Sequence, residues 1–500
     1  MINVLEYLEE SARKFPNKIA FQDESTSITY QELVIESKRM GSSLAKLVKP
    51  RTPIPVYMEK SVETMTLFFG IVYAGCFYVM LDTKQPKVRV DHILATLESD
   101  FIVSADSAAE DFEKLEFKGT CIDVRDLKQD IDEALLARIR AQALDIDPLY
   151  GIFTSGSTGV PKGVIVAHRS VIDFIDIFTE TFKITNEDII GNQAPWDFDV
   201  SVKDIYSTIA SSATMQIIPK QYFSNPTKLL DYLCERNVTT IIWAVSAVCI
   251  ISILKGFKYK IPALQKVMFS GEVMPIKQLN VWKEYLPNAM YVNLYGPTEI
   301  TCNCTYHIIQ EDYEPGDVIP IGIPFKNEHV FLLDDEDNEV SAVGKLGEIV
   351  VSGTAVTLGY YNNAEQTQKA FVQNPLNKNY LETIYRTGDL GYYNEDGLFC
   401  FASRKDFQIK HMGHRIELGE IESMMEKVTQ IERACCIFEN NKIYGFYNGD
   451  IERKELIQEL KITLPVFMIP NVFKQVEQFP ITKNGKIDRN KLKEMIEVKK

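Results

Sequence analysis

The sequence has no run of the roughly 20 apolar residues that a membrane-spanning helix needs. Its most apolar stretch, residues 65–80, is interrupted by Tyr73, Gly75 and Tyr78 and predicts buried core. The N-terminus has early acidic residues and no apolar signal region, so we expect a cytoplasmic protein without membrane insertion. Basic charge is also scarce, because 54 Lys and Arg oppose 69 Asp and Glu, giving a formal net charge of −15. Binding nucleic acid needs a basic surface, and we expect no such partner.

The nine cysteines do not indicate a disulfide framework or a zinc site in this chain of 500 residues. Their number is odd, and the pairs Cys302 with Cys304 and Cys435 with Cys436 lack zinc-ligand spacing and nearby histidines. We expect reduced, mostly buried thiols. Internal repeats and low-complexity tracts are absent too, which favours a few globular domains.

Helical and strand patterns alternate from the N-terminus to about residue 350, which is typical of α/β layers around mostly parallel sheets. One early helix is expected to start after Ser27 or Thr29, either of which can cap it. Around residues 320–400, short strands separated by turn dipeptides predict a small antiparallel β unit. We therefore expect an α/β protein in which a large N-terminal domain of mixed and parallel sheets flanked by helices, residues 1–403, precedes a small α+β C-terminal domain, residues 404–500.

The clearest local signal is the string FTSGSTGVPKG at residues 153–163, which lies between two apolar strand patterns. In such a loop, backbone N–H groups and hydroxyls can face phosphate oxygens, the glycines permit close approach, and Lys162 adds a positive charge. The loop is not a P-loop of the GxxxxGK[ST] kind, because Gly163 follows Lys162. By composition alone, an ordinary turn stays equally open.

The full string resembles the signature loop of the AMP-forming adenylating enzymes, which include acyl-CoA synthetases, amino-acid adenylation domains and firefly luciferase. Four more stretches resemble the family's other motifs in the family's order: NLYGPTE at 293–299, YRTGD at 385–389, RKDFQIK at 404–410 and PITKNGKID at 480–488. The resemblance spans essentially the whole chain. It implies an ATP- and Mg²⁺-dependent ligase that joins a carboxylate to AMP and then passes the acyl group to a thiol.

The resemblance also implies a role for each motif residue. Lys486 would be the catalytic lysine in preference to Lys483, because the family motif places it directly after Asn-Gly. Glu299 would bind Mg²⁺, with an exposed loop acid as the alternative, and Asp406 would be the hinge of a mobile C-terminal domain. The nucleotide would be held by the loop residues Thr154, Ser155, Gly156, Ser157, Thr158, Gly159 and Lys162, by the turn residues Asn293, Leu294, Tyr295, Gly296, Pro297 and Thr298, and by Asp389 and Arg404. In this set Tyr295 would stack on adenine, Thr298 would contact the α-phosphate, and Asp389 would accept the ribose hydroxyls.

Asp199, in NQAPWDFDVSV at 192–202, matches the aspartate that pairs with the substrate's α-ammonium in amino-acid-activating members. A buried carboxylate is costly unless it is paired, so Asp199 favours an amino acid over a simple carboxylic acid. A helix-capping aspartate is the alternative. The motifs imply that the pocket is further lined by Val200, Lys203, Val248, Met268, Ser270, Leu294, Cys302 and Asn303.

Within the family the chain is most similar to the D-alanine–carrier protein ligases, which load D-alanine onto a phosphopantetheine carrier protein. Lys203 is a departure from these ligases, which have an apolar residue there. Lying four residues after Asp199, it would share a helix face with that aspartate. It would pair with Asp199, point to solvent, or meet a second substrate carboxylate. The last case would make glutamate or aspartate the substrate, and some glutamate-activating members are similar in having lysine at this place.

The resemblance leaves several functions open. The first is a ligase that charges a carrier protein in trans with a small amino acid, or with an acidic one for nonribosomal peptide-type synthesis; the chain ends soon after the lysine motif, from which we expect no fused carrier. The second is a CoA ligase for a small carboxylic acid, which Asp199 disfavours. The third is a nucleotide-binding protein without chemistry, disfavoured because every charged catalytic candidate is present.

Overall fold

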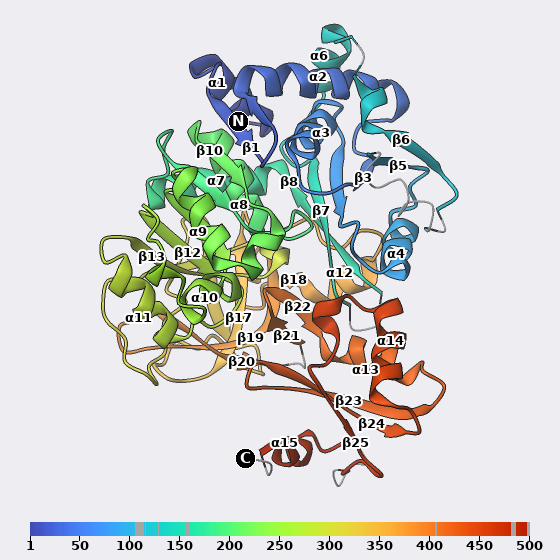
Figure 1. Cartoon of the computed structure of the whole chain (residues 1–500), viewed down its shortest axis with the longest axis vertical. Helices are drawn as coiled ribbons and strands as arrows, with labels where there is room; N and C mark the ends of the chain where they lie inside the picture. Colours follow the sequence, from blue (N-terminus) through green and yellow to red (C-terminus); the bar gives the residue numbers. More distant parts are fainter. Residues whose placement is uncertain are drawn as a thin grey trace.

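The computed structural model describes residues 1–105, 115, 117–128, 130–156, 160–405, 408–481 and 487–497. In these residues the strands form five sheets, and helices pack around the two largest (Figure 1). The predicted α/β fold, with a large N-terminal part and a smaller C-terminal part, is confirmed.

The largest sheet carries much of the site. It has nine strands in the order β15-β14-β13-β12-β11-β9-β10-β1-β2, parallel from β13 to β1 and antiparallel at both edges. Its strands are β1 (Ile19–Gln22), β2 (Ser27–Thr29), β9 (Ile189–Asn192), β10 (Thr214–Ile217), β11 (Thr240–Ala244), β12 (Lys266–Ser270), β13 (Met290–Tyr295), β14 (Thr305–Ile308) and β15 (Ile323–Pro324). The helices between them are α7 (His168–Phe182), α8 (Val200–Ser211), α9 (Pro226–Glu235), α10 (Val245–Ile253) and α11 (Ile276–Tyr285).

The second sheet has six strands, parallel except for its last pair. Its order is β6 (Thr120–Asp123), β5 (Phe101–Ser104), β3 (Pro53–Tyr57), β4 (Phe77–Leu81), β7 (Pro148–Thr154) and β8 (Lys162–Ala167). The stretch 65–80 forms most of α3 (Val62–Tyr73) and of β4, and it is buried, as expected. Thr29 caps α2 (Tyr30–Leu47), because its hydroxyl accepts from the Glu32 N–H while the Glu32 carboxylate accepts from the Thr29 N–H. The other helices of this region are α1 (Leu5–Lys14), α4 (Lys87–Leu97) and α6 (Glu133–Ala141).

The predicted antiparallel β unit is confirmed as a five-stranded sheet. It contains β16 (Glu328–Leu333), β17 (Gly347–Gly353), β18 (Phe371–Gln373), β19 (Thr383–Tyr393) and β20 (Phe399–Arg404), with α12 (Ala364–Ala370) before β18. The pairing of β19 with β20 sets Asp389 opposite Arg404.

The C-terminal part has its own core. The hairpin β21 (Gln408–His411) and β22 (His414–Glu417) leads into α13 (Leu418–Glu426). A three-stranded sheet follows, made of β23 (Ile431–Glu439), β24 (Lys442–Gly449) and β25 (Val472–Gln475), with α14 (Arg453–Thr463) and α15 (Arg489–Glu497). Ile416, Ile421, Met425, Leu456 and Leu460 form a hydrophobic cluster separate from those of the N-terminal part.

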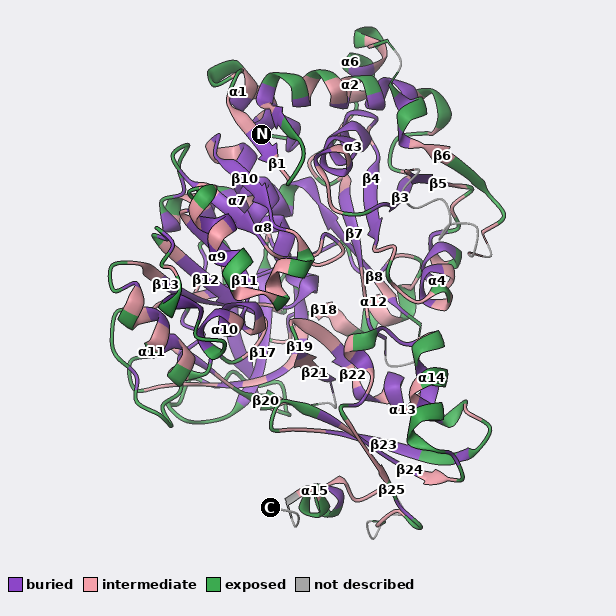
Figure 2. Ribbon diagram, viewed as in Figure 1, coloured by how far each residue is buried: buried purple, intermediate pink, exposed green. Residues whose placement is uncertain are grey.

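Burial follows this layering. Figure 2 shows the strands of the two large sheets mostly in the buried colour, while α2 and α6 at the periphery expose much of their surface. All nine cysteines carry free thiols, and seven of them are buried, as expected. No helix in the described part of the chain combines the length and apolar character required to cross a membrane.

Candidate active site

The carboxyl ends of the parallel strands gather the first site residues. The register aligns Ala244 of β11 with Ser270 of β12, and Ser270 with Leu294 of β13. Tyr295 ends β13, and the short 3₁₀ helix Thr298–Ile300 follows it. Ligands of open α/β sheets bind outside this edge.

Asp199 faces this edge from the start of α8. It occupies the N-cap position, but its side chain makes no capping hydrogen bond, so the capping alternative is not realised. Instead the Thr298 hydroxyl donates to its Oδ2 at 2.6 Å. Burial raises the pKa of Asp199, and the Thr298 bond and the cations Lys203 and Lys410 only partly oppose that rise. The carboxylate is therefore suited to gain a cationic partner.

Lys203 is completely buried, which excludes the solvent-facing alternative. Its ammonium donates to Asn303 Oδ1 at 2.6 Å and to Cys302 Sγ at 3.1 Å. The Cys302 thiol in turn donates to the backbone carbonyl of Asp199 at 3.1 Å. Among the residues that the structure describes, no carboxylate lies within the 4.0 Å of an ion pair with Lys203. The pair with Asp199, one of the three alternatives, is therefore not formed in this arrangement.

The turn that presents Cys302 and Asn303 is strained. Thr301 and Cys302 have φ of 53° and 87°, in the left-handed region that non-glycine residues avoid. Such backbone costs about 1–3 kcal/mol per residue and concentrates at functional sites. The Thr301 hydroxyl fixes the turn by donating to the Ala355 carbonyl at 2.6 Å. Sequence periodicity carries no signal for this strain.

Glu299 is a buried acid and not the exposed loop acid considered as the alternative. Its Oε1 accepts from the Tyr360 hydroxyl at 2.7 Å, and its Oε2 accepts from Arg415 Nη1 at 2.6 Å. Burial alone would raise the pKa of Glu299, but Arg415, Lys162 and the Tyr360 hydroxyl outweigh it and lower that pKa to about 2.

The donor set around Glu299 does not fit a metal ion in this arrangement. Both carboxylate oxygens are engaged, one by a hydroxyl and the other by a guanidinium. Across the described ranges, no cluster of three or more His, Cys, Asp or Glu side chains is placed to hold a metal. Mg²⁺, which prefers carboxylate and water oxygens at short distance, would have to displace Arg415 to bind Glu299.

The residues expected at the adenosine end are brought together. The Tyr295 hydroxyl donates to Asp389 Oδ2 at 2.5 Å, and Arg404 pairs with the other oxygen of the same buried carboxylate. The Lys410 ammonium, on β21, lies 5.6 Å from the centre of the Tyr295 ring. From the sequence, Lys410 was part of the hinge motif at 404–410 and had no predicted role. The structure places it at the site.

The predicted phosphate loop joins β7 to β8, where Thr154 is paired with Lys162. Gly156 is required by space, since a Cβ there would lie 2.1 Å from the Val160 carbonyl oxygen. Thr154 Oγ1 is buried and has no hydrogen-bond partner among the described residues, and the Ser155 hydroxyl donates to the Arg415 carbonyl at 2.6 Å. The loop residues Ser157, Thr158 and Gly159, the hinge Asp406, and Lys483 and Lys486 all lie outside the described residues.

The remaining expected pocket residues divide between two cores. Met268, Leu294 and Cys302 pack in one hydrophobic cluster, whereas Val248 packs with Trp243 and Trp282 in another. Because residues 245–253 are almost all apolar, their pattern does not tell which face of α10 would line the site. The others are buried too: Val200 at the start of α8, Ser270 at the end of β12, Asn293 within β13, and Pro297 and Asn303 in the segment that follows β13. Gly296 is also needed there, because a Cβ would lie 2.6 Å from Asn303 Cα.

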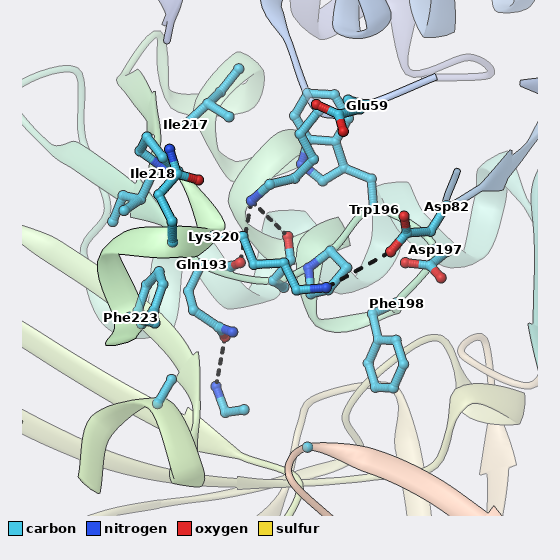
Figure 3. A pocket seen from close by; sticks show the side chains of 18 of the residues that line it. Glu59, Asp82, Gln193, Trp196, Asp197, Phe198, Ile217, Ile218, Lys220 and Phe223 are labelled. Carbon is cyan, nitrogen blue, oxygen red and sulfur yellow. Dashed lines mark hydrogen bonds and ion pairs between the residues drawn. The ribbon is translucent and has the colours of Figure 1, made fainter. Parts of the chain in front are cut away.

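Two pockets meet at this site. A cavity of about 660 Å³ is lined by residues of both parts of the chain, among them Trp196, Ala247 and Met412 (Figure 3). A smaller pocket holds Thr154, Ser155, Asp199, Thr298 and Arg415. Asp197, Phe198 and His414 line both.

The rings of Phe198 and His414 meet edge to face at the junction of the two pockets, 4.5 Å apart. The Phe467 ring stacks on the His414 ring, with 3.5 Å between the two ring centres. Burial lowers the pKa of His414 to about 3, so it is neutral at physiological pH. Neither His414 nor Arg415 was identified by sequence reasoning, because both come from a hairpin whose docking partner lies elsewhere in the chain.

A glycine-rich loop and the carboxylates Asp199 and Glu299 at the carboxyl edge of parallel strands are typical of a nucleotide-binding α/β enzyme. Residues 8–361 match the AMP-binding enzyme family, and the chain belongs to that family. The resemblance noted from the motifs is therefore confirmed.

Curated relatives extend the match over almost the whole chain. The D-alanine--D-alanyl carrier protein ligase of Staphylococcus aureus (strain Newman) is 30% identical, covering 99% of this chain and 100% of that protein. Tyrocidine synthase 1 of Brevibacillus parabrevis is also 30% identical over 98% of this chain, but the chain spans only 45% of that protein's length.

Solved structures share the fold. An artificially fused adenylation–PCP di-domain, NpsA-ThdA from Klebsiella oxytoca, superposes with a TM-score of 0.83 at 20% identity, covering 95% of this chain and 94% of that one. Holo-PA1221, with adenylation and PCP domains, gives a TM-score of 0.82 at 23% identity, covering 99% and 84%.

Proposed function

We propose that the chain is an AMP-forming ligase that activates an amino acid with ATP and transfers the aminoacyl group to the phosphopantetheine thiol of a carrier protein. One observation carries the proposal: the partly buried Asp199 carboxylate lines the small pocket, accepts from the Thr298 hydroxyl and forms no ion pair among the described residues. A carboxylate that is largely withdrawn from water and has no cationic partner favours a substrate that brings one. The relatives named above support the carrier protein as acceptor.

The first half-reaction would use the N-terminal residues to hold both reactants. Asp199 would accept the α-ammonium, which aims the substrate carboxylate toward Thr298. Asp389 and Arg404 would fix the ribose, and Lys162 would offset phosphate charge. Joining two anions needs preorganised positive charge more than covalent help, and Lys486 would supply it at the reacting atoms.

The second half-reaction would use the cavity of about 660 Å³. Exposed Glu59, Lys220 and Met412 mark its outer part, and Phe198 and His414 mark its inner end. A flexible thiol arm entering there would reach the small pocket of Asp199 and Thr298. We propose that the arrangement seen, with the β21–β22 hairpin at the site, serves this step, and that residues 404–500 turn about Asp406 to bring Lys486 in for the first step.

The test is amino-acid-dependent exchange of pyrophosphate into ATP, measured for D- and L-amino acids with simple carboxylic acids as controls. Exchange with an amino acid, and transfer to a holo carrier protein but not to CoA, is the expected result. Exchange with simple acids alone would contradict the role given to Asp199. Transfer to CoA and not to the carrier would instead support the CoA ligase alternative.

An acidic amino acid is the second candidate substrate, and Lys203 favours it. A fully buried ammonium is rare without a carboxylate partner. Its present acceptors are neutral, the Asn303 amide oxygen and the Cys302 sulfur. A side-chain carboxylate of glutamate or aspartate would give it the missing negative charge.

Replacing Lys203 with Met should shift the preference toward small neutral amino acids. The change removes a buried charge and keeps the volume, so the protein should stay folded, with an unchanged or raised Tm. For a wild-type enzyme that prefers glutamate or aspartate, we expect a loss of about 100-fold or more in kcat/KM for that substrate, the typical cost of leaving a buried carboxylate unpaired. An unchanged order of substrates would mean that Lys203 does not face the substrate.

A further inference from the structure

Asp197 lies where the two pockets meet. Among the described residues, only Asp197, Phe198 and His414 line both the large cavity and the small pocket. The small pocket holds Asp199 and Thr298, beside which the activated carbonyl group would sit, and the large cavity is the route proposed for the thiol arm. A group at the junction would therefore meet both partners of the second half-reaction.

The Asp197 carboxylate is held through one oxygen. It belongs to a turn in which the Phe198 N–H donates to the Pro195 carbonyl at 3.2 Å. Its Oδ2 accepts from Gln85 Nε2 at 2.7 Å, and no hydrogen bond from another described residue engages its Oδ1. Figure 3 shows the carboxylate at the cavity wall, next to that of Asp82. One oxygen is thus available to accept a proton from a molecule in the junction.

The surroundings of Asp197 make it a stronger base than an ordinary aspartate. Withdrawal from water and then the neighbouring Asp82 raise its pKa to about 6, while the Gln85 bond and the Arg89 guanidinium oppose the rise. The titratable groups around it are Asp82, Arg89 with its partner Glu420, Lys60, Lys220, Asp199 and the neutral His414. The carboxyl is therefore ionised at neutral pH, and its pKa lies close to that pH, as suits a general base.

The other titratable groups at this place are less suited to take a proton. Burial lowers the pKa of His414 to about 3, so its imidazole holds a proton weakly. Asp199 accepts from the Thr298 hydroxyl, and the proposed function assigns it to the substrate ammonium. Asp197 is the remaining carboxylate in the small pocket.

A thiol that reaches the junction has to lose its proton there. The thiolate is the nucleophile, and a thiol with a pKa of about 8.5 is mostly protonated at neutral pH. Trp196, Phe198, Val200 and Ala247 line the cavity with apolar surface, and an apolar environment raises the pKa of a thiol further. A positioned base that removes the proton during attack typically speeds such a step by about 10²- to 10⁴-fold.

We propose that Asp197 is the general base of the thiol-transfer step. The inference rests on the proposed function, because it takes a phosphopantetheine thiol as the acceptor of the aminoacyl group. As the sulfur bonds to the aminoacyl carbonyl carbon, the S–H proton passes to the Asp197 carboxylate. The bond between that carbon and the AMP phosphate oxygen then breaks, AMP leaves with the electron pair, and Asp197 releases the proton to solvent.

The test follows thiol transfer in a single turnover, apart from adenylate formation. The full chain is loaded at neutral pH with ATP, Mg²⁺ and the radiolabelled amino acid that supports pyrophosphate exchange. It is then mixed with pantetheine or with a holo carrier protein in buffers from mildly acidic to alkaline pH, and thioester formation is timed by rapid quenching. Asp197→Asn is the main variant, because its amide oxygen can still accept from Gln85.

In Asp197→Asn we expect transfer at neutral pH to be about 100-fold slower or more, with pyrophosphate exchange close to wild type. The deficit should narrow at alkaline pH, where the thiolate forms without a base. Asp197→Glu should recover part of the rate. Asp396→Asn makes the same chemical change at an exposed position between β19 and β20, and it should behave as wild type.

The pH profile of the wild type is a second measurement that needs no variant. Only the ionised form of Asp197 accepts a proton, so the transfer rate should fall as pH drops through about 6. A wild-type profile without this fall would overturn the proposal, even if Asp197→Asn does not fold.

The other outcomes separate this proposal from the proposed function. Wild-type transfer in Asp197→Asn would overturn the general base alone, and so would equal losses of exchange and transfer, which indicate a structural role. If the wild type forms no aminoacyl-adenylate with any amino acid, the proposed function fails first and the general base fails with it.

Discussion

Replacing Lys486 with Ala should nearly abolish adenylate formation while ATP binding stays close to wild type. The lysine would neutralise charge that develops where carboxylate meets α-phosphate, and removing one such preorganised group typically costs about 10²–10³-fold in kcat. The measurement is amino-acid-dependent pyrophosphate exchange, with ATP affinity measured separately. Transfer from a supplied aminoacyl-adenylate should be largely retained, because that half-reaction does not use this lysine.

Lys483→Ala is the matched control, since it removes the same charge from the same loop. The two lysines lie between Ile481 and Ile487, which pair with each other as an antiparallel bridge. Loss of exchange in Lys483→Ala with activity retained in Lys486→Ala would move the catalytic role to Lys483.

The position of Ile487, next to this loop, indicates that the C-terminal part would have to rotate. Ile487 packs with Cys435, Ile437 and Phe446, whereas Cys436 of the same strand packs with the α13 core. Alternating strand residues point to opposite faces, so Ile487 lies on the face of β23 and β24 turned away from α13. Figure 1 shows α15, which follows Ile487, at the far end of the molecule from α8. Rotation of residues 404–500 is thus the movement we propose for bringing the lysine to Asp199.

The second large effect is expected from Asp199→Asn. The amide keeps the shape and the Thr298 contact but leaves the substrate ammonium without its counter-charge. Breaking a buried pair costs about 3–5 kcal/mol, which corresponds to a loss of roughly 10²- to 10⁴-fold in kcat/KM for the amino acid. ATP affinity should change little, because the adenosine cluster is not touched. Steady-state exchange kinetics at varied amino-acid and ATP concentrations separate the effect on the amino acid from the effect on ATP.

Asp204→Asn is the control for this substitution. Asp204 lies on the same helix, is fully buried and accepts from Asn192 Nδ2 at 2.6 Å, but it has no bond to Thr298. It should keep the amino-acid KM of wild type. A similar loss in both variants would mean that the effect comes from disturbing α8 and not from the substrate ammonium.

The pH dependence gives Asp199 an independent signature. Burial raises its pKa, so the ionised form that pairs with an ammonium is present above the raised pKa and is lost as pH falls through it. The KM for the amino acid should therefore rise toward acidic pH in the wild type. The rise should be absent in Asp199→Asn, because the asparagine has no carboxyl group to titrate.

The sequence alone determined the elements and the family. Strand patterns on either side of the loop at 153–163 became β7 and β8, and the apolar stretch 65–80 became buried core, because burial imposes periodicities that local sequence displays. Asp199 and Lys203, for which the spacing predicted a shared helix, lie at the N-cap and in the first turn of α8. Motif order predicted that Tyr295, Asp389 and Arg404 belong to one site, and the fold brings their side chains into contact.

Only the tertiary structure decided the partners of the charged groups. A helical period tells which face a lysine occupies but not what lies opposite, and Lys203 meets Asn303, 100 residues away, and not Asp199. Arg415 reaches Glu299 across 116 residues because the C-terminal part, which has its own core, docks on the larger part of the chain. Such contacts depend on how two independently packed surfaces fit together, and no local pattern in either segment encodes that fit.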